Sequence, residues 1–102
     1  MPALCQLLKH LPPVLAAEVL HGSPELRISR ITDNSREAGP GSLFVAVRGT
    51  RVDGHDFIPQ AIAQGCRCLM VEDEPGLIRG ITIIRVKNSS AAPGWLSAAL
   101  HD

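Results

Sequence analysis

Residues 31–54, ITDNSREAGPGSLFVAVRGTRVDG, contain the features that decide how this chain folds. A polar turn at Thr32–Arg36 and a Gly39-Pro40-Gly41 break precede an uninterrupted apolar run, Leu43–Val47. A second polar turn, Gly49–Gly54, follows the run. Because no polar residue interrupts the run, it predicts a strand covered on both faces, as in the middle of a three-layer sheet. The stretch therefore predicts a buried strand with a polar turn at each end.

The residues after this stretch predict a helix and two further strands. Asp56 is a suitable N-cap for the helix, and Gly65 suits the left-handed position that follows a helix. The expected apolar face of the helix consists of Phe57, Ile58, Ala61 and Ile62. Apolar runs at 68–71 and 81–86 predict the strands. The order strand, helix, strand indicates a parallel pair joined by a right-handed crossover.

The two ends of the chain predict one helix each. Leucines at 4, 7, 8 and 11 have helical spacing, and Pro12-Pro13 ends that helix. Segments 14–20 and 26–31 predict a strand pair or hairpin across the turn at 21–24. A last helix, capped by Asn88-Ser89-Ser90, would have an apolar side of Ala92, Trp95, Leu96, Ala99 and Leu100. Together these elements predict an α/β fold, a small three-layer α/β/α unit with a mixed, partly parallel sheet.

Composition limits the kinds of partner. The 102 residues predict a single domain, 1–102, and ten basic residues balance ten acidic ones. This balance argues against nucleic acid or an anionic membrane as a partner. No apolar run approaches the roughly 20 residues of a spanning helix, so we expect a cytoplasmic protein. The chain stops at His101-Asp102 directly after an apolar helical face, which suggests a domain of a longer protein.

Two groups of side chains raise the question of metal binding or catalysis. Cys66-x-Cys68 would lie on one face of a strand, although core packing explains both thiols better. His55, between Asp53 and Asp56, could serve acid–base or metal-dependent chemistry. The plainer interpretation is that Asp53 orders a turn and Asp56 caps a helix. We therefore expect no metal site and no catalytic residue.

The two polar turns carry the groups that a nucleotide requires. Hydroxyls, a carboxylate and an amide can bind a base edge and ribose, and guanidinium groups can bind phosphate. In open α/β sheets ligands lie beyond the carboxyl ends of strands, where the turn after Val47 is expected. Neither GxxxxGK(S/T) nor GxGxxG occurs, so the chain has no recognisable ATP site. The polar side chains in question are Thr32, Asp33, Asn34, Ser35, Arg36, Thr50 and Arg51.

Residues 31–72, ITDNSREAGPGSLFVAVRGTRVDGHDFIPQAIAQGCRCLMVE, resemble the amino-terminal domain of the Mur ligases, most closely the MurE type. The family pattern has a T-x-D-S-R turn, then P-G-D-L-F-V-A, G-x-x-x-D-G-H-x-F-I and a V-V-V-E strand. The match is continuous over about forty residues. This sequence has Asn34 where the turn usually has Asp, Ser42 where Asp is common, and Ser90 where Arg is frequent. We expect the first two differences to leave binding intact.

The resemblance implies a fold like the MurE and MurF amino-terminal domains and a role in binding the UDP part of a UDP-MurNAc-peptide. It implies that central and C-terminal domains of a parent chain bind ATP with Mg²⁺ and the incoming amino acid. The parent would activate a peptide carboxylate as an acyl phosphate, and this domain alone would be inactive and contain no cofactor. The implied UDP contacts are Asp33, Ser35, Thr50, Arg51 and Val52, with Thr32, Asn34, Arg36, Asp53, Gly54 and His55 as supporting residues.

Two other functions remain open at this level. A stand-alone interaction or regulatory module could reuse the fold without binding a nucleotide. A metal-dependent hydrolase could use His55 with the two neighbouring aspartates, and it would bind a stoichiometric metal ion.

Overall fold

The structure is a computed structural model that describes residues 3–48, 53–73, 75–76 and 78–100. Five strands of the described chain form one mixed sheet in the order β1-β5-β4-β3-β2. Strands β2 to β5 are parallel, and β1 is antiparallel to β5. The strands are β1 (Glu18–His21), β2 (Arg30–Thr32), β3 (Ser42–Val45), β4 (Cys68–Val71) and β5 (Thr82–Arg85).

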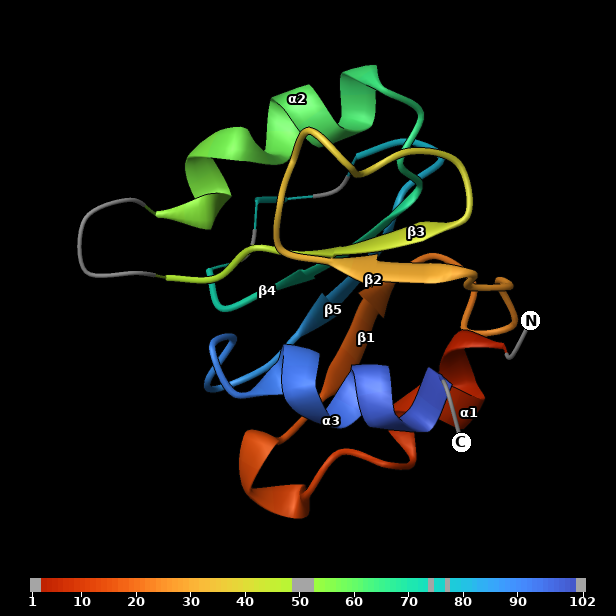
Figure 1. The fold of residues 1–102 in the computed structure, drawn as a ribbon, viewed down its shortest axis with the longest axis vertical. Helices are drawn as coiled ribbons and strands as arrows, with labels where there is room; N and C mark the ends of the chain where they lie inside the picture. The colour runs from red at the N-terminus through yellow and green to blue at the C-terminus, as the bar shows by residue number, and fades with distance from the viewer. Residues whose placement is uncertain (1–2, 49–52, 74, 77, 101–102) are drawn as a thin grey trace.

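Helices cover both faces of the sheet and complete the three layers. Figure 1 shows α2 on one face, and α1 and α3 on the other. The α-helices are α1 (Leu4–Leu8), α2 (Ile58–Ala63) and α3 (Ala92–Leu100), and two 3₁₀ segments are η1 (Pro13–Leu15) and η2 (Gly54–Phe57). The predicted α/β fold with a mixed, partly parallel sheet is confirmed.

The core consists of two aliphatic layers, one on each side of the sheet. Alternate residues of β3, together with Ala46, which follows it, pack into different layers, because successive side chains of a strand point to opposite faces. Leu43 and Val45 pack toward α1 and α3, whereas Phe44 and Ala46 pack toward α2. All four side chains are fully buried. The prediction that this strand is covered on both faces is therefore confirmed.

The hairpin prediction is wrong. β1 and β2 lie at opposite edges of the sheet, and β1 instead pairs with β5, with Glu18 opposite Arg85. The turn near Gly22 reverses the chain but sends it across the amino ends of the strands. There Arg27 forms an isolated bridge with Ala3.

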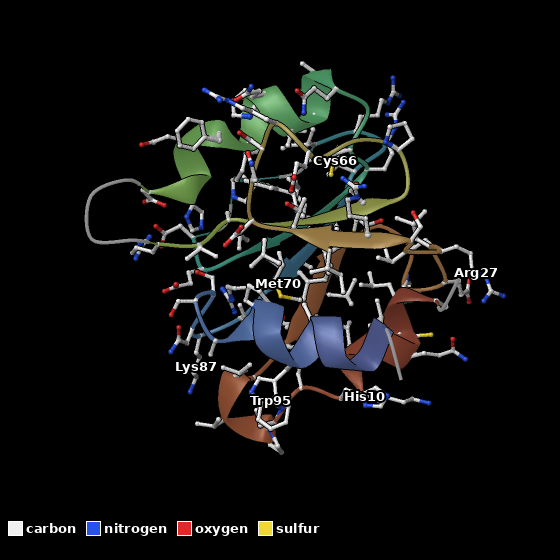
Figure 2. All side chains as sticks on the ribbon, in the orientation of Figure 1. His10, Arg27, Cys66, Met70, Lys87 and Trp95 are labelled. Carbon is white, nitrogen blue, oxygen red and sulfur yellow. The ribbon has the colours of Figure 1, made fainter. Side chains whose placement is uncertain are left out.

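Three side-chain predictions also need correction. Cys66 comes before β4 and packs on the α2 side, whereas Cys68 packs on the side of α1 and α3, so the two thiols do not share a face. Figure 2 shows Cys66 on the α2 side and Met70 on the other. Trp95, expected on the buried side of α3, is 51% exposed. Asp56 does not cap α2, because η2 intervenes and the carboxylate of Asp53 accepts the first hydrogen bond.

Candidate functional site

The first polar turn follows β2 and is ordered by its own side chains. The Thr32 hydroxyl accepts a hydrogen bond from the Asn34 backbone N–H at 3.0 Å. Asn34 Oδ1 accepts from the Arg36 N–H, also at 3.0 Å. Such local bonds are typical of Ser, Thr and Asn in turns. Asp33, Asn34 and Arg36 are left exposed to solvent.

Ser35 attaches this turn to α2. Its side chain is buried, and its hydroxyl donates to Oε1 of Gln60 at 2.9 Å. Gln64 Nε2 donates to the Ser35 carbonyl and, at 2.7 Å, to that of Ala38. The Ser35 hydrogen is used toward Gln60, but the lone pairs of the Ser35 oxygen can still accept a hydrogen bond from a ligand.

The turn and the start of α2 enclose a surface pocket of about 420 Å³. Its polar wall provides a carboxylate, amides, a hydroxyl and a guanidinium group. Its other wall includes Phe57, which is 39% exposed rather than buried on the helix face as predicted. Sequence reasoning missed Phe57 and Gln60 as pocket residues, because helical spacing alone does not reveal which side faces the turn. The lining residues are Asp33, Asn34, Ser35, Arg36, Phe57 and Gln60.

Three of the predicted contacts of the second turn, Thr50, Arg51 and Val52, lie outside the described residues. The residues on either side of them are close together. Arg48 and Asp53 form an antiparallel bridge, and Arg48 Nε lies 3.6 Å from Asp53 Oδ2. The chain thus leaves the end of β3 and returns to it beside the first turn.

The last part of the second turn is shaped in different ways by Asp53, Gly54 and His55. Asp53 Oδ1 accepts from the His55 N–H at 2.9 Å, which caps η2. Gly54 donates its N–H to the Val47 carbonyl at 2.8 Å. A Cβ atom at Gly54 would lie 2.7 Å from the Val47 nitrogen, so only glycine permits this approach. Imidazole Nδ1 of His55 lies 2.6 Å from Asp53 Oδ1.

Two carboxylates near this return have lowered pKa values. The His55 backbone N–H is the main cause for Asp53, followed by the His55 side chain and, more weakly, Arg48. Burial acts to raise the pKa of Glu72, but hydrogen bonds from the hydroxyl and N–H of Ser89, together with Arg48 and His55, outweigh it. Both groups are therefore held as anions.

The arrangement does not suit a metal-dependent hydrolase. Nε2 of His55 accepts hydrogen bonds from the Glu72 and Asp73 N–H groups at 3.0 and 3.1 Å, and Nδ1 contacts Asp53. Both ring nitrogens are thus already used within the fold, whereas a metal requires a lone pair on one of them. Among the described residues, no three His, Cys, Asp or Glu side chains are grouped to hold a metal ion.

A comparison with models of protein families matches the part of the chain that contains the two polar turns. The model described as Mur ligase family, catalytic domain, matches residues 27–98, which include both polar turns and four of the strands. The chain belongs to the Mur ligase family. It corresponds to the amino-terminal domain of these ligases.

Several relatives with a matching sequence are named as ligases of the MurE type. The chain is 37% identical over 99 residues to the UDP-N-acetylmuramoyl-L-alanyl-D-glutamate--2,6-diaminopimelate ligase of Bacteroides thetaiotaomicron, covering 96% of this chain and 20% of the relative. It is 41% identical over 90 residues to the ligase of the same name from Parabacteroides distasonis, covering 87% and 18%. The chain thus spans about one fifth of the length of these relatives.

Solved Mur ligase structures contain the same fold. A crystal structure of MurF from Acinetobacter baumannii superposes with a TM-score of 0.78 at 29% identity, over 96% of this chain and 20% of that one. None of the helices among the described residues has the length and apolar character that a membrane span requires. The MurE- and MurF-like fold expected from the sequence is confirmed.

Proposed function

We propose that this chain binds the uridine diphosphate part of a UDP-MurNAc-L-Ala-D-Glu substrate for an ATP-dependent, amino-acid-adding ligase of bacterial cell-wall synthesis. The observation that carries the proposal is the pocket between the first turn and α2, found in a chain of the Mur ligase family. The parent ligase would act in the cytoplasm and would supply ATP and Mg²⁺ sites from its other domains.

Each side of the pocket offers a different part of nucleotide recognition. The exposed carboxylate of Asp33 can accept hydrogen bonds from ribose hydroxyls or the uracil N3–H, and the Arg36 guanidinium can bind a phosphate oxygen. The exposed face of Phe57 can stack on a base, an interaction that aromatic side chains make with any base. Thr50, Arg51 and Val52 complete the proposed contacts on the basis of the family resemblance.

The proposal is tested by titrating the ¹⁵N-labelled chain with UDP in heteronuclear NMR spectra. We expect the amide signals of Asp33, Ser35 and Phe57 to shift with saturation at millimolar ligand, because an isolated domain lacks the contacts of its partner domains. CDP is the matched control ligand, since it keeps the diphosphate but lacks the uracil N3–H donor. It should bind more weakly.

Two outcomes would contradict the proposal. No shift in the first turn at millimolar UDP would favour an interaction module that does not bind nucleotides. Equal shifts with UDP, CDP and inorganic pyrophosphate would show binding of phosphate without recognition of uracil.

A further inference from the structure

Five residues from four segments of the chain form a closed ring of polar contacts at the carboxyl ends of β3, β4 and β5. We call it the carboxyl-end ring, and its members are Arg48, Asp53, His55, Glu72 and Ser89. The Arg48 N–H donates to Ser89 Oγ at 3.2 Å, and the Ser89 hydroxyl donates to Glu72 Oε2 at 2.6 Å. The Glu72 N–H donates to Nε2 of His55, and Nδ1 of the same imidazole contacts Asp53. The ion pair between Asp53 and Arg48 closes the ring.

His55 is the member that joins the two halves of the ring. Its side chain is only 12% exposed. Because Nε2 faces two backbone N–H donors, it must carry the lone pair, and Nδ1 must carry the hydrogen that is donated to Asp53. The Asp53 carboxylate contacts the imidazole directly, and Arg48 pairs with the carboxylates of both Asp53 and Asp73 beside it.

The ring connects directly to the pocket through η2. His55 lies within η2, whose last residue is Phe57, and α2 continues from there to Gln60. Phe57 and Gln60 line the pocket, and Gln60 also accepts the Ser35 hydrogen bond. The position of this wall depends on the core packing of α2 and on what holds η2 to the end of β4. The His55 contacts to the Glu72 and Asp73 N–H groups hold it there.

We propose that His55 is a positioning residue: its Nδ1–H tautomer holds η2 against β4 and thereby places Phe57 and Gln60 at the nucleotide pocket. The inference rests on the proposed function of that pocket. It differs from a general stabilising role because it requires one tautomer and both ring nitrogens.

The tautomer is measured first, without any ligand. Long-range ¹H–¹⁵N spectra of the imidazole groups should give a protonated Nδ1 and a lone-pair Nε2 for His55. His10, which is exposed on the α1 side of the molecule (Figure 2), provides an internal comparison. A protonated Nε2 or an average of both tautomers at His55 would overturn the proposal even if no variant could be purified.

Two substitutions then separate the two ring nitrogens. The side-chain amide of His55→Asn can replace the donor at Nδ1, and that of His55→Gln can replace the acceptor at Nε2. Each variant loses one of the two contacts, so we expect UDP affinity to fall about two- to tenfold in each. The loss should be larger in His55→Ala. Binding is measured only on variants whose NMR spectra show a folded chain, and His10→Gln is the matched control.

The outcomes separate this inference from the proposed function. Unchanged UDP affinity in folded His55→Asn and His55→Gln would overturn the positioning role while leaving UDP binding intact. Failure of the wild-type chain to bind UDP would overturn the proposed function. In that case the amide shifts of Phe57 and Gln60 decide the matter. These signals should move in both His55 variants and should stay at their wild-type positions in His10→Gln. Unchanged signals in the His55 variants would overturn the proposal that His55 positions the pocket wall.

Discussion

Neighbouring residues of the first turn differ in whether their side chains bond within the fold or face solvent. The hydroxyls of Thr32 and Ser35 are used within the fold, whereas Asp33 and Arg36 present their charges to solvent beside the pocket. Sequence alone identified the turn and its polar groups as a candidate site. It did not identify the Ser35 hydroxyl as a structural group, because its partner, Gln60, is distant in sequence.

Replacing Asp33 should affect binding and leave stability unchanged. We expect Asp33→Ala to weaken UDP binding about two- to tenfold, because one exposed hydrogen-bond acceptor is lost. Its free energy of unfolding should stay within about 0.5 kcal/mol of wild type, as for most surface substitutions. NMR titration and urea denaturation measure the two quantities. Glu25→Ala, the loss of an exposed carboxylate elsewhere, is the control and should leave UDP affinity unchanged.

Ser35 should show a clear effect on stability. Ser35→Ala removes the partly buried hydrogen bond to Gln60, and we expect the free energy of unfolding to fall by about 0.5–1.5 kcal/mol. A double-mutant cycle with Gln60→Ala, followed by urea denaturation, isolates the pairwise term. Additive effects in the cycle would show that the two side chains do not interact in solution.

At the level of elements, the sequence predicted what each segment is better than what it contacts. The apolar runs located β3, β4 and β5 because burial on both faces leaves a local pattern. The pairing of β1 with β5 left no such pattern, since the partner lies 67 residues away. The start of α2 was misplaced for a related reason: Asp53 caps a 3₁₀ turn, η2, which the approach of Gly54 to Val47 permits, and α2 begins only after it.

Two glycines should respond in opposite directions to substitution by alanine. A Cβ atom at Gly54 would meet backbone atoms of Val47, and we expect Gly54→Ala to destabilise the chain by about 1–3 kcal/mol. Gly94 lies in α3 with no atom within 4 Å of its expected Cβ. Gly94→Ala should therefore stabilise the chain by about 0.5–1 kcal/mol. Thermal and urea denaturation measure both, and equal effects of the two substitutions would contradict the steric argument.

The whole molecule is a sheet between two aliphatic layers, and the carboxyl-end ring lies at one end of its parallel strands. The resemblance to the Mur ligases and the apolar patterning of the sequence both predicted this architecture. The carboxyl-end ring was not predictable, because its residues are spread from Arg48 to Ser89 and each has an ordinary local explanation in the sequence.

The lowered pKa values in the ring predict how stability depends on pH. A carboxyl group with a lower pKa in the folded state binds fewer protons there than in the unfolded chain. The stabilisation that such a group adds to the folded state is complete above the ordinary glutamate pKa of about 4.3. It is lost as the pH falls through the lower pKa of the folded state. Glu72→Gln should therefore be less stable than wild type at pH 7 and should lose less stability on acidification.

Urea denaturation at a series of pH values between about 2 and 7 measures this difference. In Ser89→Ala the free energy of unfolding should also depend less on pH, though by a smaller amount, because the Ser89 hydrogen bonds help to lower the pKa of Glu72. Parallel curves for wild type and Glu72→Gln would contradict the assignment.

The antiparallel edge formed by β1 and β5 has a consequence for the newly made chain. On a ribosome that adds about 5–20 residues per second, residues 18–21 emerge roughly 3–13 s before the strand that pairs with them. Parallel pairing of β2, β3 and β4 can begin in that interval, but Val19 must wait for Ile84. We therefore expect the edge strand β1 to pair only once β5 is available, so that the apolar side chains of β1 stay exposed until then.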